Sequence, residues 1–283
     1  MHQISNSTEV CFLTTVFPMP IDFLYDFFDS LDQQSYKSFD LIIVNDGNQD
    51  LEMLIKKYNL IHAIVIPAGE SPIDNREIMI RFAIKNKYKI AVFGDSDDKF
   101  SENRISVAVE KLQSVDIIVN DLNTFTGSKL IQSYYLSNRV INEEHIHINN
   151  ILEYNILGLS NTAVNISILQ GLTFPFDKNV IALDWYLFSI LLSQNVLASF
   201  TNKSVTYYRQ HENNIAGMGI INDDSIKKTI LVRIQHYQAL SPYIAMANEL
   251  KNEMITLQKD EIKQNTLLNQ IKKKQPFPLW WEL

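Results

Sequence analysis

Apolar segments of strand length alternate with helix-like segments through the first 120 residues, and this rhythm limits the fold more than any other feature. Strands are predicted at 10–17, 40–44, 63–66, 89–93 and 116–120. Helices are predicted from Pro20 to about Leu31 and at 51–58, 75–86 and 101–113. Repeated β-α units of this length predict an α/β fold with a mostly parallel central sheet and helices on both faces.

The rhythm changes after residue 120. Residues 121–150 are polar and rich in Asn and Ser, which predicts a hairpin or loop region with substrate contacts. The apolar window 180–200 contains Asp184 and several polar residues, so it predicts a buried helix and strand and not a membrane span. Residues 226–274 predict an amphipathic helical appendage that is interrupted at Ser241-Pro242.

Charge and cysteine content exclude several classes of protein. The formal net charge of -7 argues against a general nucleic-acid-binding surface, which needs a basic excess to replace phosphate counterions. The single cysteine, Cys11, falls in a predicted strand and indicates neither a disulfide framework nor a zinc site. Met1–Glu9 is polar and does not resemble a secretory signal, so we expect a cytoplasmic protein.

Three carboxylates in four residues, Asp95-Ser96-Asp97-Asp98, directly follow a predicted buried strand and Gly94. Ligands of open α/β sheets bind beyond the carboxyl ends of the strands, which is where this loop is expected. Clustered carboxylates repel one another unless a cation neutralises them, and hard oxygen ligands suit Mg²⁺ or Mn²⁺. A metal-bound diphosphate is the ligand that fits best, whereas an ordinary acidic turn with a helix cap is the alternative.

The motifs and their order resemble the family 2 inverting glycosyltransferases, which have the GT-A fold. The resemblance covers roughly residues 10–217. It rests on six segments: Thr14-Thr15-Val16-Phe17-Pro18, Ile42-Ile43-Val44-Asn45-Asp46-Gly47, Asn75-Arg76, Asp95-Ser96-Asp97-Asp98, Leu183-Asp184-Trp185, and Tyr208-Arg209-Gln210-His211-Glu212-Asn213-Asn214. With this reading, residues 1–220 would form the GT-A catalytic domain and residues 221–283 a helical C-terminal extension.

The resemblance implies a transfer of sugar from a nucleoside-diphosphate-sugar donor to a hydroxyl of a saccharide or glycolipid acceptor, in surface polysaccharide or glycolipid assembly. It implies Mn²⁺ or Mg²⁺ as the cofactor, with Asp97 and His211 as ligands and Asp95 near both the ribose and the metal. Asp98 would orient the site. It implies donor contacts from Thr15, Phe17, Asp46, Arg76, Asp95, Ser96 and Arg209, and Asp184 as the general base.

Physical roles can be argued for three of these residues. Asp46 follows the second predicted strand, where a carboxylate accepts hydrogen bonds from a base or ribose, although Asn-Asp-Gly is also a common turn sequence. Arg76 begins a predicted helix and could reach a phosphate, or it could be an exposed helix-end arginine. Asp184 lies among apolar residues, where desolvation raises the pKa of a carboxyl group and suits a base; an N-cap is the alternative.

Other functions remain open from the residues alone. Asn45 and Leu183 stand where the family usually has acids, which favours an inactive nucleotide-sugar-binding or scaffold protein. A nucleotidyltransferase would also use a metal at a sheet edge, but a glycine-rich phosphate loop is missing near the first strand. A phosphatase would carry its acids after the first strand. The C-terminal segment from Lys272 to Trp281 combines lysines with aromatic residues, which suits peripheral contact with the inner face of a membrane, docking on the chain itself, or an oligomer contact.

Overall fold

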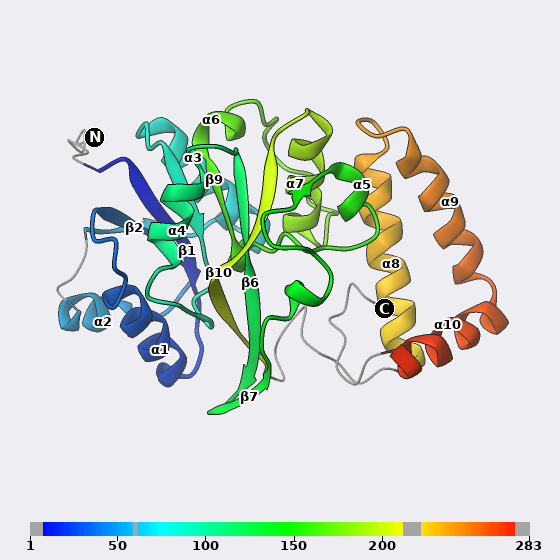
Figure 1. The fold of residues 1–283 in the computed structure, drawn as a ribbon, viewed down its shortest axis with the longest axis horizontal. Coiled ribbons are helices and arrows are strands. Elements are labelled where there is room, and N and C mark those ends of the chain that lie inside the picture. Colours follow the sequence, from blue (N-terminus) through cyan, green and yellow to red (C-terminus); the bar gives the residue numbers. More distant parts are fainter. Residues whose placement is uncertain (1–7, 59–61, 212–221, 275–283) are drawn as a thin grey trace. The chain divides into compact units, whose positions relative to one another are not determined.

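The computed structural model describes residues 8–58, 62–211 and 222–274. The chain divides into two compact units. The first unit comprises the residues up to 146 together with 158–176 and 196–209, and the second comprises 147–157, 177–195 and the residues from 210 onward. Figure 1 shows the strands of the first unit and the helices of the second.

The first unit is built on one sheet whose strands run in the order β3-β2-β1-β4-β9-β6-β10-β5, with β7 on β6 and β8 on β10. The strands are β1 Val10–Val16, β2 Phe39–Asn45, β3 Ala63–Pro67, β4 Ile90–Phe93, β5 Lys99–Phe100, β6 Ile117–Thr126, β7 Lys129–Gln132, β8 His145–Ile146, β9 Thr162–Asn165 and β10 Ala198–Arg209. Neighbours among β1 to β4 pair in parallel, as do β6 and β10. Strand β9 lies between β4 and β6 and is antiparallel to both.

Helices of the first unit are α1 Ile21–Asp32, α2 Leu51–Lys57, α3 Pro72–Lys85, α4 Arg104–Lys111 and α6 Ile166–Leu169, with single 3-10 turns at Leu136–Asn138 and Leu159–Asn161. Helix α1 buries Leu24, Phe27, Phe28 and Leu31, which recur at helical spacing. Phe27 and Phe100 pack edge to face on Phe12 from β1, with ring centroids 6.0 and 5.2 Å away. This aromatic cluster fixes α1 and β5 against β1.

The second unit is helical in its described part: α5 Ile148–Ile151, α7 Leu183–Ser193, α8 Asp223–Leu240, α9 Met246–Gln258 and α10 Glu261–Lys274. Buried Ile226, Ile230, Leu268 and Ile271 form the contact between α8 and α10, which lie beside α9 in Figure 1. On α7, Trp185 stacks on His236 of α8 with ring centroids 3.8 Å apart. The indole N–H of Trp185 donates to the carbonyl of Ile151.

Most elements expected from the sequence are present, including the α/β sheet, the C-terminal helices and their interruption after Leu240. Three expectations at element ends were wrong. Helix α3 begins at Pro72 and not at 75, because the Ser71 hydroxyl caps it by accepting from the Asp74 N–H. Residues 101–103 precede α4, and Phe100 belongs to β5. Strand β6 continues to Thr126 and forms the expected hairpin with β7.

The expected boundary at residues 220 and 221 stays a prediction, because both residues lie outside the described part of the chain. The window 180–200 forms α7 and the start of β10, as expected. Among the described residues, none of the helices combines the length and apolar character that a membrane span requires. The aromatic tail from residue 275 onward lies outside the described residues.

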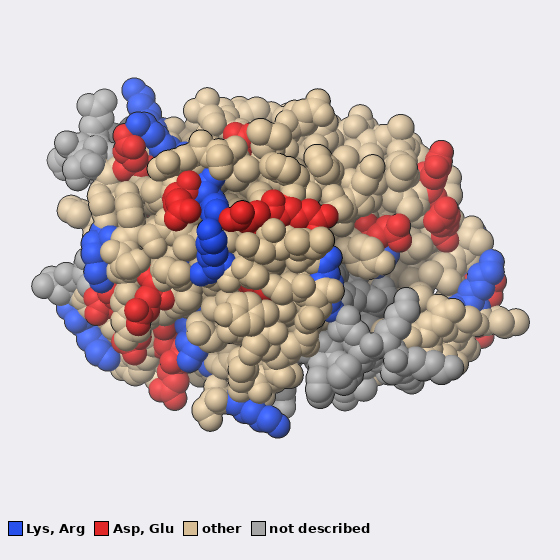
Figure 2. Space-filling model, in the orientation of Figure 1, with Lys and Arg blue, Asp and Glu red and all other residues tan. Residues whose placement is uncertain are grey.

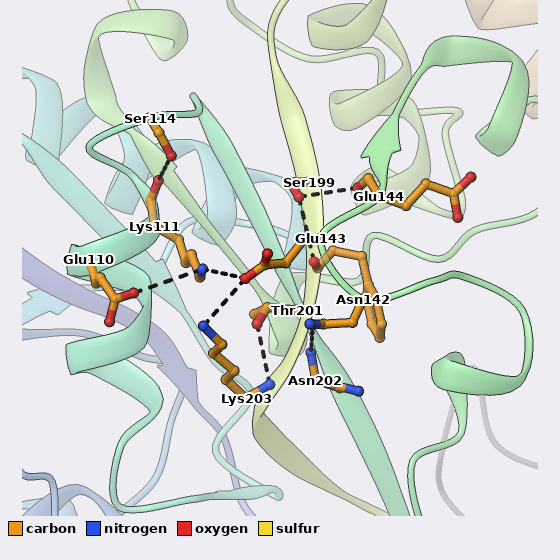
Figure 3. Close-up of polar contacts among 11 residues, drawn as sticks. Glu110, Lys111, Ser114, Asn142, Glu143, Glu144, Ser199, Thr201, Asn202 and Lys203 are labelled. Atoms are coloured by element: carbon orange, nitrogen blue, oxygen red, sulfur yellow. Dashed lines mark hydrogen bonds and ion pairs between the residues drawn. The ribbon is translucent and has the colours of Figure 1, made fainter.

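Polar contacts fix the loop before β8 to the sheet. Glu143 has a left-handed backbone with φ of 66°, and its carboxylate receives Lys111 of α4 at 2.7 Å and Lys203 of β10 at 3.3 Å, as Figure 3 shows. The Asn142 side chain accepts from the Asn202 N–H at 2.9 Å. Glu143 and Lys203 are exposed to solvent, so these ion pairs add little stability. On the face drawn in Figure 2, acidic and basic side chains lie interspersed.

Candidate functional site

Three polar segments begin at one edge of the sheet because three parallel strands end there. In the register of the sheet, Val16 of β1 lies opposite Asn45 of β2, and Leu13 of β1 lies opposite Phe93 of β4. The residues that follow these ends include Phe17, Asp46 and the acidic loop. The residues after these strand ends, which the sequence predicts to contact the nucleotide-sugar donor, therefore meet at the carboxyl edge of β1, β2 and β4. This is the expected ligand edge of an open α/β sheet.

Arg76 joins β1 to the acidic loop. One guanidinium nitrogen donates to the Thr15 hydroxyl and the other to the Asp95 carboxylate, both at 2.5 Å. The buried Ser96 hydroxyl donates to the Thr15 carbonyl at 2.8 Å. Arg76 is only 20% exposed in its side chain, so the interpretation as an exposed helix-end arginine was wrong. Four residues predicted to contact the nucleotide-sugar donor thus form one hydrogen-bonded group: Thr15, Arg76, Asp95 and Ser96.

Asp46 is held from α3 as well. The side-chain N–H of buried Asn75 donates to the Asp46 carboxylate at 3.0 Å. The side-chain oxygen of Asn75 accepts from the Gly69 N–H at 2.7 Å. Asn45 closes the local turn by accepting the Asn48 N–H at 2.9 Å. The turn interpretation of Asn-Asp-Gly is therefore confirmed, and the role of Asp46 in donor binding stays a prediction.

Asp98 differs from the other two acids of its loop because it is fully buried. It accepts from the Arg209 N–H at 2.8 Å and from the Ser160 hydroxyl at 2.5 Å. Burial raises the pKa of Asp98 well above its usual range, and the charges of Asp97 and Asp95 raise it further. Asp95 and Asp97 are half-buried. The loop therefore has one acid packed inside and two acids accessible to a ligand.

Arg209 is enclosed by protein groups. Its guanidinium donates to the Asp26 carboxylate of α1 and to the Asp97 carbonyl, each at 2.6 Å. It lies 4.2 Å from the ring centroid of Phe23 and 4.5 Å from that of Phe125. Sequence reasoning missed Asp26, because this acid stands 183 positions from its partner in an ordinary amphipathic helix.

The acidic loop can be tested for its fit to a divalent cation. Within residues 8–58, 62–211 and 222–274, protein side chains do not gather into a set of three or more His, Cys, Asp or Glu ligands. Mg²⁺ in proteins usually keeps waters and is bound through one or two carboxylates plus substrate phosphates. Asp95 and Asp97 supply such a pair of carboxylates, so the loop fits a cation that a bound diphosphate helps to coordinate.

Asp184 and His211 belong to the second unit. Asp184 lies in the first turn of α7 and is half-buried; it accepts from the Asn155 side-chain amide at 3.1 Å and from the Trp185 N–H at 2.8 Å. The N-cap of α7 is Ala182, so the alternative interpretation of Asp184 as an N-cap was wrong. His211 is half-buried just after β10, and the later part of its motif, Glu212-Asn213-Asn214, lies outside the described residues.

Comparison with solved structures places this fold. TarS residues 1–349 from S. aureus align with a TM-score of 0.62 and 15% identity over 88% of this chain and 71% of that chain. The complex of the same protein with UDP-GlcNAc aligns with a TM-score of 0.62 and 14% identity, over 88% of this chain and 72% of that chain. The mannosyltransferase PcManGT from Pyrobaculum calidifontis, in complex with GDP-Man and Mn²⁺, aligns with a TM-score of 0.56 and 12% identity. The alignment covers 93% of this chain and 79% of that chain.

A search of curated proteins gives no match for this sequence. The family model described as "Glycosyl transferase family 2" matches residues 19–177, which is more than half of the 283 residues. This matched range contains Asp46, Asn75, Arg76 and the acidic loop. The chain therefore belongs to glycosyl transferase family 2 and is a glycosyltransferase with a GT-A fold.

Proposed function

We propose that this glycosyltransferase is metal-dependent and inverting, and that it transfers a sugar to a hydroxyl of a saccharide or glycolipid acceptor. The observation that carries the proposal is the hydrogen-bonded group of Thr15, Arg76, Asp95 and Ser96 at the carboxyl edge of the sheet. We place the reaction in surface polysaccharide or glycolipid assembly in the cytoplasm, at the inner face of a membrane. Membership of the glycosyl transferase family favours sugar transfer over the reaction of a nucleotidyltransferase or a phosphatase.

The acidic loop would hold the donor diphosphate through Mn²⁺ or Mg²⁺. Asp97 would coordinate the cation with His211, and Asp95 would contact the ribose and the cation. Cleavage of the bond between sugar and phosphate builds negative charge on the departing diphosphate, and a bound cation stabilises that charge as a Lewis acid. PcManGT in complex with GDP-Man and Mn²⁺ supports this choice of ligand and metal.

The nucleoside would lie near Asp46, Arg76 and Phe17. Asn75 occupies one carboxylate oxygen of Asp46 and so orients the other toward a donor group of the base or ribose. Phe17 is 38% exposed just after β1, where its ring would lie along the nucleoside. The Arg76 contact to Asp95 fixes the loop, and the same guanidinium would face the phosphates.

Asp184 would act as the general base. The acceptor oxygen attacks the anomeric carbon, the bond to the diphosphate oxygen breaks, and the hydroxyl proton passes to Asp184. A single displacement inverts the anomeric configuration. Hydrogen bonds from Asn155 and from the Trp185 N–H orient this carboxylate.

Asp184→Asn tests the base. An Asn side chain has one acceptor oxygen, so the hydrogen bond from Asn155 or from the Trp185 N–H is lost, which costs about 1 kcal/mol and lowers Tm by roughly 2–4 °C. Loss of a base lowers turnover by roughly 10²-fold or more with little change in donor affinity. Hydrolysis or transfer is measured with UDP-GlcNAc and GDP-Man, and the exposed acid Asp177→Asn is the matched control.

Turnover within a few-fold of the wild type in Asp184→Asn would contradict the base assignment. A wild-type chain that binds these nucleotide sugars but turns over neither, even with an acceptor panel, would favour an inactive binding or scaffold protein. Leu183, in place of the family's usual acid, is the feature that favours this second function; it is buried and 7% exposed.

A further inference from the structure

Arg209 and Asp26 form an ion pair that acts on the acidic loop from outside it. Arg209 ends β10 and is 4% exposed, whereas Asp26 lies on α1 with a side chain 39% exposed. We propose that Asp26 and Arg209 are positioning residues for the acidic loop. In this role they fix the part of the chain that carries Asp97. The identity of the ligand rests on the proposed function.

Arg209 holds two consecutive loop residues at once. Its backbone N–H donates to the Asp98 carboxylate at 2.8 Å, and its guanidinium Nε donates to the Asp97 carbonyl at 2.6 Å. A residue fixed at its carbonyl and at the side chain of its neighbour has little freedom to move. The backbone of Asp97 is therefore held by β10, which lies several strands away from β4 in the sheet.

The guanidinium itself is fixed by groups outside the loop. The rings of Phe23 and Phe125 cover it, and Asp26 pairs with its outer nitrogen at 2.6 Å. Asp26 also lies 3.6 Å from the ammonium of Lys99, the residue directly after the acidic loop. One carboxylate on α1 therefore pairs with two cations, one that contacts the loop and one that follows it in the chain.

Removal of Asp26 changes this balance of charges. A buried guanidinium that loses its carboxylate is stabilised by pairing with another carboxylate, because an unpaired buried charge is costly. Arg209 already contacts the Asp97 carbonyl and Lys99 follows Asp98 in the chain, so either side chain competes with a divalent cation if it turns toward the loop carboxylates. Partners that hold metal ligands typically affect metal affinity by about 10–100-fold when they are mutated.

The test compares Asp26→Ala with Asp22→Ala, which removes an exposed acid from the first turn of the same helix. Mn²⁺ affinity is measured at 25 °C by electron paramagnetic resonance of free Mn²⁺, with UDP or GDP present. Hydrogen exchange of the peptide covering residues 94–100 is followed without metal. We expect Asp26→Ala to raise the Mn²⁺ Kd about tenfold or more and to speed exchange of the loop, and Asp22→Ala to change neither.

Arg209→Lys keeps the charge but loses the Nε donor, so it provides a second variant if Asp26→Ala folds poorly. The double variant should be no worse than the more affected single variant, because the two residues act as one unit. Loop exchange and Mn²⁺ Kd within twofold of the wild type in a folded Asp26→Ala protein would overturn the proposal, as would additive effects. A wild type that binds no Mn²⁺ overturns the proposed metal, and the exchange result then decides the positioning role.

Discussion

Gly94 connects β4 to the acidic loop, and its lack of a side chain leaves room for two aromatic rings. A Cβ built at Gly94 would lie 2.3 Å from Cζ of Phe12 and 2.6 Å from Cζ of Phe100. Both rings are buried and pack edge to face on each other and on Phe27. A rigid ring held on several sides cannot move aside as the end of a flexible side chain would.

Gly94→Ala should therefore destabilise the protein. Overpacking of a close-packed core costs about 1–3 kcal/mol, and three contacts below 3 Å, made with the rings of Phe12 and Phe100, place this variant at the upper end, about 3 kcal/mol. For a chain of this size, that loss lowers Tm by roughly 6–12 °C. Urea unfolding and thermal unfolding both measure it.

The matched control is Gly127→Ala. Gly127 has a φ of +54° and open space around the site of a Cβ, so the variant should lose only about 1 kcal/mol from backbone strain. Phe12→Leu in the Gly94→Ala background makes room for the methyl group, and the double variant should be less destabilised than the sum of its parts by about 1 kcal/mol or more. A Gly94→Ala protein within 0.5 kcal/mol of the wild type, as a rough threshold, would refute this reasoning.

Three further predictions concern protonation and stereochemistry. Burial, and then the charge of Arg233, lower the pKa of His236 from its usual 6.5 to about 3, so the unfolded state binds more protons between these values. Wild-type stability should fall as pH drops below about 6.5, and His236→Phe should remove this part of the slope in a series of Tm measurements; an unchanged slope contradicts it. The raised pKa of Asp98 gives the opposite pH dependence of stability. The native state keeps the Asp98 proton to a higher pH than the unfolded state does, so stability is lost as pH rises from about 4 through the raised pKa. Asp98→Asn, compared with the wild type in EDTA, should lack this loss, and a curve parallel to the wild type would be evidence against it. Product NMR should show inversion of the anomeric configuration, whereas retention would exclude a single displacement assisted by Asp184.

The sequence was sufficient to predict features that depend on local pattern and on strand ends. Apolar runs marked β1, β2 and β4, and the residues after them met at one edge because parallel strands end together. Arg76 reached Thr15 and Asp95 because α3 begins beside that edge. These contacts follow from the order of elements, which the sequence displays.

Other features depend on contacts between distant segments. Lys99 and Phe100 directly precede the predicted helix 101–113 and carry no strand signal of their own, yet they pair with Tyr207 and Thr206 of β10. The antiparallel insertion of β9 between β4 and β6 leaves no local signal in a short apolar strand. Asp26 lies within the predicted helix from Pro20 to about Leu31 without a local signal for its partner, and only the fold brings Arg209 to it.

The central claim is that Asp97 binds a divalent cation together with the donor diphosphate. The most direct measurement is the change in Tm that Mn²⁺ produces in the presence of UDP or GDP, for the wild type, Asp97→Ala and the exposed control Glu102→Ala.

At a ligand concentration of about 100 times Kd, binding stabilises the native state by about 2.7 kcal/mol, which raises Tm by roughly 5–10 °C. We expect this Mn²⁺-dependent rise in the wild type and in Glu102→Ala. Asp97→Ala should have nearly the wild-type Tm without ligand and should lose the rise. An Asp97→Ala protein that keeps the full Mn²⁺-dependent rise, or a wild type that shows none, would contradict the claim.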